Sequence, residues 1–175
     1  MDKQPPTQLY PQRHYSRLNN YDYSSPSAYF VTICTLGKIC LFGDIIDSTM
    51  KLNQSGLIVE SSWKDIPLHY SNVNNDIFIV MPNHIHGIIS INGIGRAGSK
   101  PAPTKQYSLS ELVRAFKTYS SRRINKIRNS QGVPVWQRGY YERVIRNEND
   151  YRQVGDYILY NAAKWESESE NPLQI

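Results

Sequence analysis

The sequence predicts an α+β fold in which a mainly antiparallel sheet is flanked by helices. Runs rich in β-branched and aromatic residues and amphipathic stretches follow one another in the order strand, helix, strand, strand, helix, strand. Strands and helices alternate too little for a doubly wound parallel sheet. The length of 175 residues suits one compact domain. This order of elements is compatible with a ferredoxin-like or RRM-like arrangement.

The first half of the chain accounts for most of the predicted sheet. Residues 29–35 are dense in β-branched and aromatic side chains and predict a strand, with residues 39–42 as its hairpin partner. Apolar residues at three- and four-residue steps predict an amphipathic helix over residues 51–67, which a proline should end. Two further strands are expected over residues 75–81 and 84–91. The first of these is continuously apolar and is therefore predicted to lie at the centre of the sheet.

The second half of the chain supplies two long helices. Glycine and proline residues predict a loop over residues 93–107, after which a serine begins a helix over residues 108–127. Residues 133–146 predict irregular structure that leads into a strand. A last helix is expected over residues 147–165.

Composition divides the chain and excludes several classes of protein. A polar N-terminal arm is predicted over residues 1–28, one domain over residues 29–165 and a solvated acidic tail over residues 166–175. No apolar stretch approaches the roughly 20 residues that span a bilayer, and the N-terminus lacks the apolar segment of a secretory signal. Cys34 and Cys40 lie in an apolar stretch and predict buried, reduced thiols, which favours a cytoplasmic protein without membrane partners.

Two of the four histidines, His84 and His86, lie one residue apart in an apolar run. Because side chains alternate along a strand, both rings are predicted to project from the same face, about 7 Å apart along the strand. Two imidazoles so placed can converge on one divalent metal ion. The alternative is that both are polar, solvent-facing residues of a half-buried strand.

A basic segment points to nucleic acid. The net charge is +5, yet residues 105–146 hold ten basic residues against two acidic ones, with aromatic residues interleaved. Positive charge that tracks phosphates and rings that stack on bases are what single-stranded nucleic-acid binding requires. A solvated helix face with core aromatic residues would give the same pattern. The candidate nucleic-acid-binding residues are Arg114, Lys117, Arg122, Arg123, Lys126, Trp136, Arg138, Arg143 and Arg146.

The last helix offers a second set of chemical groups. At 100° per residue, Tyr157, Asn161 and Lys164 lie within about 60° of one another, so a hydroxyl, an amide oxygen and an ammonium can face one site. A helical tyrosine is more often structural, and among 13 tyrosines the spacing alone does not single out Tyr157.

Blocks of sequence spread over most of the chain together resemble the HUH single-tyrosine transposases, and among these the REP-associated tyrosine transposases. The similarity spans roughly residues 13–165 in the family's order. The blocks are Pro82-Asn83-His84-Ile85-His86, Val135-Trp136-Gln137-Arg138-Gly139-Tyr140-Tyr141-Glu142, Ile145-Arg146-Asn147, Asp150-Tyr151-Arg152 and Asp156-Tyr157-Ile158-Leu159-Tyr160-Asn161.

The resemblance assigns roles of the family's motif residues to single residues of this chain. His84 and His86 match the family's histidine-hydrophobe-histidine motif, and Tyr157 matches the nucleophile. Asn161, one turn later, matches the third metal-binding side chain. The chain departs from the family at Ala162, where relatives often have proline, and in the length of the 93–107 segment. The family's antiparallel sheet flanked by helices agrees with the fold predicted above.

The resemblance implies a metal-dependent transposase, an endonuclease and strand transferase acting on single-stranded DNA near hairpins. His84, His86 and the side-chain oxygen of Asn161 would hold Mg²⁺ or Mn²⁺ against the scissile phosphate. Tyr157 would attack phosphorus and form a 5′-phosphotyrosine, which a second 3′-hydroxyl can reverse. Lys164 is a candidate accessory cation on its helical position alone. The expected partner is single-stranded or hairpin DNA, and the expected state is a monomer or homodimer.

Two other functions are compatible with the sequence. A non-catalytic module that binds hairpin or single-stranded nucleic acid predicts salt-sensitive binding that ignores EDTA and survives His84→Ala. A metal-dependent hydrolase in which water attacks predicts turnover without a trapped protein–DNA ester.

Overall fold

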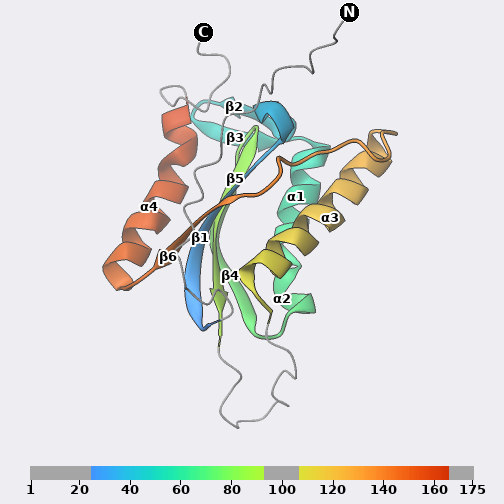
Figure 1. Cartoon of the computed structure of the whole chain (residues 1–175). Coiled ribbons are helices and arrows are strands. Elements are labelled where there is room, and N and C mark those ends of the chain that lie inside the picture. Colours follow the sequence, from blue (N-terminus) through green and yellow to red (C-terminus); the bar gives the residue numbers. More distant parts are fainter. Residues whose placement is uncertain (1–24, 93–106, 166–175) are drawn as a thin grey trace, which may run out of the picture.

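A four-stranded antiparallel sheet organises the protein, in the strand order β4-β5-β1-β6 (Figure 1). The computed structural model describes residues 25–92 and 107–165. The four strands are β1 (Ser27–Cys34), β4 (Val73–Val80), β5 (His84–Ile91) and β6 (Tyr141–Ile145). With the helices that flank this sheet, the arrangement confirms the predicted α+β fold.

The helices cover the two faces of the sheet separately. Helices α1 (Gln54–Lys64) and α3 (Leu109–Ile127) lie on one face, and α4 (Glu148–Lys164) lies on the other (Figure 1). Ile85 and Ile89 of β5 belong to the larger core under α1 and α3, whereas Ile88 packs in a smaller core with apolar residues of α4. The alternation of side chains along β5 therefore turns the two histidines toward α4.

The segment after β1 differs from the prediction. A second, two-stranded sheet pairs β2 (Gly43–Ile46) with β3 (Thr49–Leu52), whereas residues 39–42 form no strand. The turn between β2 and β3 places Asp47 and Ser48 at positive φ, which suits a tight hairpin turn. The prediction that residues 39–42 pair with the first strand is therefore wrong. The hairpin that follows joins β2 to β3.

The predicted helix over 51–67 is shorter and is followed by a second one. Residues 51 and 52 belong to β3, and the Asn53 side chain caps α1 by accepting a 3.0 Å hydrogen bond from the Gly56 N–H. The short helix α2 (Ile66–His69) begins just after α1 and carries Pro67 in its first turn, where no amide donor is needed.

Strand β4 lies at the edge of the sheet, although its apolar run predicted a central position. Its apolar character comes from cover on both faces: Phe78 packs against the core under α1, and Ile77 and Ile79 pack against the core under α4. Edge strands and central strands of a sheet can both be apolar when helices cover both faces, so composition did not distinguish the two positions.

The two cysteines are free thiols, as predicted, but they are not both buried. Cys34 at the end of β1 is half-buried, and Cys40, which follows the 3₁₀ helix η1 (Leu36–Lys38), is exposed. No helix in the described ranges combines the length and the apolarity that crossing a membrane demands.

The two long helices predicted for the second half are confirmed. Helix α3 begins after Ser108, which forms a capping box with Glu111, and α4 begins after Asn147, whose side chain accepts from the Asp150 N–H. Most of the predicted arm, the predicted loop and the acidic tail fall on residues 1–24, 93–106 and 166–175, outside the described residues.

Gly87 of β5 lies directly against the Trp63 side chain of α1, and it yields a stability prediction. A Cβ atom at Gly87 would lie 2.4 Å from the Trp63 indole and 3.1 Å from the Phe78 Cβ. Because Trp63 is fully buried, we expect Gly87→Ala to lower the free energy of unfolding by about 1–3 kcal/mol in urea titration. Leu68→Ala, at a residue 79 % exposed, is the control and should change it by less than about 0.5 kcal/mol. An unchanged midpoint for Gly87→Ala would contradict this packing.

Candidate active site

His84 and His86 form a buried pair under α4. Their exposed fractions are 1 % and 5 %, and their Nε2 atoms lie 3.0 Å apart. The period of two therefore places both rings on one face, as predicted. The alternative that both are solvent-facing is wrong, because α4 covers the face on which they lie.

The neighbours of His84 fix which of its nitrogens is protonated. Its Nδ1 lies 2.7 Å from Oδ1 of Asn83, while the Nδ2 of Asn83 donates to the Lys38 carbonyl at 3.1 Å. Since an amide oxygen only accepts, the His84 Nδ1 carries the hydrogen and donates it. In the neutral form of His84 the Nε2 lone pair faces the Nε2 of His86, where a proton or a metal ion can bind.

His86 is held in a similar way from the neighbouring strand. Its Nδ1 lies 2.8 Å from the Thr32 hydroxyl oxygen, and the Phe30 ring stacks on it with centroids 5.4 Å apart. Burial, and then the nearby charge of His84, hold the pKa of His86 well below its usual range. The ring is neutral at pH 7, which is the form that binds metals.

The geometry of the pair fits a divalent cation. Two ligand atoms held about 2.1 Å from one ion at a right angle lie about 3.0 Å apart. The Nε2 atoms of His84 and His86 have this separation. A proton shared between the two nitrogens would also satisfy them, so the pair alone is compatible with either occupant.

Two side chains contact this pair, one on helix α4 and one at its C-cap. The Tyr157 hydroxyl lies 3.4 Å from the His86 Nε2, and the Trp165 ring lies 5.9 Å from the His84 ring. Asn161 stands midway between these two contacts on the same stripe of the helix. Its side chain is fully buried, and within the described ranges neither its Oδ1 nor its Nδ2 has a hydrogen-bond partner.

An unpaired buried amide is costly, so Asn161 adds independent evidence for an occupant. Leaving a buried polar group without a partner costs about 1–3 kcal/mol. An amide oxygen together with two imidazole nitrogens would make a mixed nitrogen and oxygen set, which suits Mg²⁺, Mn²⁺ and several transition metals. In the described part of the chain no three His, Cys, Asp or Glu side chains gather as a metal cluster, so a three-ligand site at this pair would need a ligand of another kind, such as an amide oxygen.

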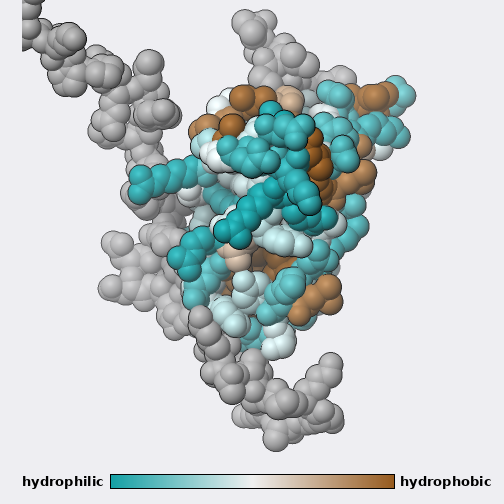
Figure 2. Space-filling view, turned by 90° about the vertical axis from the view of Figure 1, so that its right-hand side faces the viewer, coloured by the Kyte–Doolittle hydropathy of each residue, from teal (hydrophilic) through white to brown (hydrophobic). Residues whose placement is uncertain are grey.

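Part of the predicted nucleic-acid-binding set lies on the far side of the sheet. Arg114, Arg122 and Lys126 are exposed on α3, which covers the face opposite to the histidines (Figure 1). That side of the molecule, where it is coloured, is largely hydrophilic (Figure 2). Any contact that these residues make with DNA is therefore separated from Tyr157 by the thickness of the sheet.

Three residues of the predicted set have structural contacts of their own. Trp136 is 7 % exposed and its indole N–H donates to Ser120 at 3.0 Å, which corrects its assignment as a base-stacking residue. The half-buried Lys117 donates to the carbonyls of two residues in the segment before β6, at 2.9 Å for Gln137. Arg123 donates to Ser61 and Ser62 of α1, at 3.0 and 3.1 Å.

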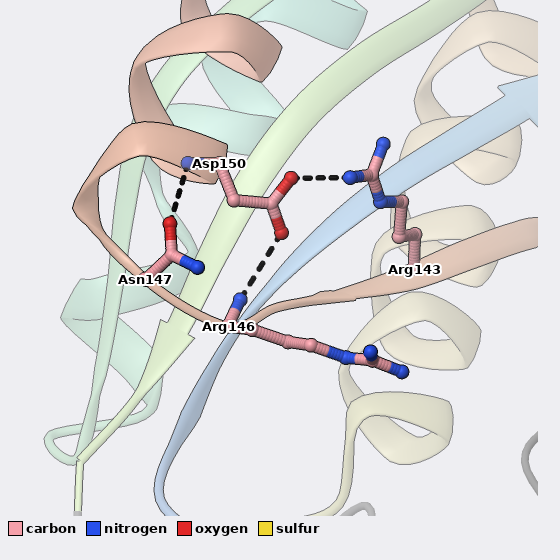
Figure 3. Close-up of polar contacts among 4 residues, drawn as sticks. All are labelled: Arg143, Arg146, Asn147 and Asp150. Carbon is pink, nitrogen blue, oxygen red and sulfur yellow. Dashed lines mark hydrogen bonds and ion pairs between the residues drawn. The ribbon is translucent and has the colours of Figure 1, made fainter.

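The remaining cations are distributed around the last strand and helix. Arg143 on β6 forms an ion pair with Asp150, whose other oxygen accepts from the Arg146 N–H at 3.1 Å (Figure 3). Arg138 and the Arg146 side chain are exposed, as is Lys164 at the end of α4. The roles of these residues toward DNA stay predictions.

Four residues that contact the histidines were not singled out from the sequence. Asn83 stands directly before His84, and its amide next to a histidine was the one local signal. Thr32 and Phe30 lie opposite the histidine strand only because β1 pairs with β5, and this register depends on the folded sheet. Trp165 stands at the end of the predicted last helix, and its contact with His84 depends on how that helix packs on the sheet.

The hydrogen bond between the His86 Nδ1 and the Thr32 hydroxyl yields a prediction about metal affinity. A partner of this kind orients a ligand histidine and selects its tautomer, and its loss typically weakens metal binding 10- to 100-fold. We expect Thr32→Val to raise the Mn²⁺ dissociation constant by about this factor in isothermal titration. Thr49→Val, at an exposed residue of β3, is the matched control and should leave the constant unchanged. Equal affinities for Thr32→Val and the unmodified chain would refute this role.

Comparison with known proteins supplies one relative and a shared fold. No family model matches the chain. An uncharacterized protein of Haemophilus influenzae (strain ATCC 51907 / DSM 11121 / KW20 / Rd) is 40 % identical over 162 residues, which cover 87 % of this chain and 89 % of the relative.

Two solved structures are similar to the protein. A REP-associated tyrosine transposase bound to a REP hairpin superposes with a TM-score of 0.56 at 19 % identity, over 85 % of this chain and 73 % of that one. A putative transposase from Deinococcus radiodurans gives a TM-score of 0.46 at 17 % identity, over 82 % and 95 % of the two chains. The first likeness confirms the fold that the sequence resemblance implied.

Proposed function

We propose that this chain, which belongs to one family with the Haemophilus protein and has the fold of a REP-associated tyrosine transposase, cleaves and rejoins single-stranded DNA near hairpins. One observation carries the proposal: the Tyr157 hydroxyl lies 3.4 Å from the His86 Nε2. A half-exposed phenol thus lies beside a buried imidazole pair. This arrangement would let one phosphate contact both the tyrosine and a cation that the pair holds.

The cation would be held by the Nε2 atoms of His84 and His86 and by the Asn161 side-chain oxygen. When bound, Mg²⁺ or Mn²⁺ would withdraw charge from the phosphoryl oxygens and orient the scissile bond. Burial keeps the His86 ring neutral, and hydrogen bonds orient both rings, through Asn83 for His84 and through Thr32 for His86. Asn161 would gain in the ligand position the partner that its buried amide lacks among the described residues.

Tyr157 would act as the nucleophile. Its oxygen bonds to phosphorus, the bond from phosphorus to the 3′-oxygen breaks, and the leaving strand takes up a proton as a 3′-hydroxyl. The phenolic proton passes to water, which reaches Tyr157 because the residue is 40 % exposed. The resulting 5′-phosphotyrosine keeps the bond energy, so a second 3′-hydroxyl can reverse the step and join strands without ATP.

The proposed substrate follows from the charge distribution. The exposed Arg143 on β6 lines the cavity beside Tyr157 and would contact the cleaved strand. Arg114, Arg122 and Lys126 on α3 would contact phosphates of a flanking hairpin stem beyond the edge of the sheet. The similar transposase whose structure is bound to a REP hairpin supports a hairpin substrate here. All proposed ligands and the nucleophile come from one chain, so a monomer suffices for one cleavage.

The test compares two labels on one hairpin oligonucleotide that carries single-stranded flanks, incubated with the chain and Mn²⁺. A tyrosine attack that releases a 3′-hydroxyl leaves the 3′ fragment on the protein. We therefore expect a 3′ label to appear on the protein after denaturing electrophoresis, and a 5′ label to appear only on the released fragment. The reverse distribution would overturn the proposed direction of attack.

The same experiment separates the alternatives. Cleavage without labelled protein would identify the hydrolase, in which water attacks. Binding that persists in EDTA with neither cleavage nor labelled protein, across a panel of hairpin sequences, would identify the binding module.

A further inference from the structure

A cavity of about 290 Å³ opens beside Tyr157, between β6 and α4. Its position next to the proposed nucleophile, on the α4 side of the sheet, places it along the path of a strand that reaches Tyr157. The lining residues are Phe30, Tyr141, Arg143, Gln153, Val154 and Tyr157.

Aromatic rings form the floor and two walls of this cavity. Phe30 is the floor at 8 % exposure, and its ring meets the edges of Tyr141 and Tyr157 at centroid distances of 6.1 and 6.0 Å. Tyr141 from β6 and Tyr157 from α4 are 47 % and 40 % exposed, so part of each phenol stays accessible to a ligand. Because these rings come from separate elements and share one floor, their spacing is fixed by the fold.

A guanidinium is held at the rim in a fixed orientation. Arg143 pairs with Asp150, and Asp150 is itself anchored by the N–H of Arg146 and donates its own N–H to Asn147 (Figure 3). The Arg143 side chain remains 51 % exposed, so N–H groups that do not face Asp150 can meet a ligand. Gln153 adds an amide, which can both donate and accept.

We propose that this cavity binds one nucleobase of the DNA strand, adjacent to the phosphate that Tyr157 attacks. This inference rests on the proposed function for its location but makes a separate claim about recognition. The volume is close to the lower limit of the roughly 300–1,000 Å³ of small-molecule sites. The cavity can therefore hold one nucleobase but not a stack of base pairs. Aromatic faces stack on any base, and a guanidinium and an amide can bond to base edges.

The test uses binding without chemistry. The 175-residue chain in EDTA would be titrated with a dodecamer of deoxyadenosine, dA12, and with a dodecamer of the same length built entirely from abasic sites. Stacking of a single base changes affinity by about tenfold. We expect dA12 to bind at least about tenfold more tightly than the abasic strand. We also expect Tyr141→Ala to weaken dA12 binding by about tenfold while leaving the abasic strand unaffected.

Two controls separate stacking from folding. Tyr141→Phe keeps the ring and should bind dA12 like the unmodified chain, and Tyr160→Ala removes a tyrosine of α4 that is 61 % exposed and outside the cavity. A 2-aminopurine placed in the dA strand should lose fluorescence on binding the unmodified chain and recover it in Tyr141→Ala.

The outcomes distinguish this inference from the proposed function. A chain that forms the tyrosine adduct but binds the abasic strand as tightly as dA12 keeps the proposed function and overturns the nucleobase site. A chain that forms no adduct, yet loses base-dependent binding in Tyr141→Ala, keeps the nucleobase site and overturns the strand transferase. Equal weakening of both strands by Tyr141→Ala also overturns the site, because the ring would then act without contacting a base.

Discussion

Tyr157→Phe is expected to abolish the covalent protein–DNA adduct completely while leaving hairpin binding within about twofold. The substitution removes only the oxygen that would bond to phosphorus, and the ring keeps its edge contact with Phe30 at 6.0 Å. The measurement is denaturing electrophoresis of the 3′-labelled hairpin with Mn²⁺, with gel retardation to follow binding.

The matched control for this prediction is Tyr160→Phe. Tyr160 lies on the same helix and is 61 % exposed, so the adduct yield of this variant should equal that of the unmodified chain. An adduct that survives Tyr157→Phe would show that another group is the nucleophile, and an adduct lost in both variants would indicate a general defect.

Removing either histidine is expected to lower the rate of adduct formation by about 1,000-fold. Charge stabilisation by a metal ion amounts to several kcal/mol, and each 1.36 kcal/mol corresponds to a factor of ten in rate. His84→Ala and His86→Ala should also abolish the Mn²⁺ binding seen by isothermal titration. Adding Mn²⁺ in excess should restore little activity, because a single imidazole and an amide hold a cation weakly.

His69→Ala is the control, since His69 is exposed at the end of α2 on the other side of the sheet. It should change neither the rate nor Mn²⁺ affinity. If His84→Ala retained full activity and ignored EDTA, the imidazole pair would be a structural hydrogen bond and the metal proposal would fail.

Local patterns predicted the elements that carry the site better than they predicted their surroundings. The period of two in a strand was enough to place His84 and His86 together, and the capping residues marked where α3 and α4 begin. The pairing of Tyr157 with this strand came from resemblance, because no local rule relates a C-terminal helix to a strand about 70 residues earlier.

What the sequence did not reveal depends on long-range packing. The hairpin of β2 and β3 was missed because Asp47-Ser48 is a weaker turn signal than Asn-Gly or Asp-Gly. Trp136 was predicted to contact DNA because the sequence pattern of interleaved aromatic and basic residues is the same whether the rings face solvent or the core. Its burial against Ser120 follows from how the segment before β6 returns to α3, which only the folded chain determines.

Anomalous diffraction from crystals of the Tyr157→Phe chain with a hairpin oligonucleotide and Mn²⁺ tests the central claim most directly. We predict one manganese peak about 2.1 Å from the Nε2 atoms of His84 and His86 and from the Asn161 side-chain oxygen, with a DNA phosphate between the ion and the ring of residue 157. Manganese elsewhere, or a ring of residue 157 turned away from the bound phosphate, would contradict the account.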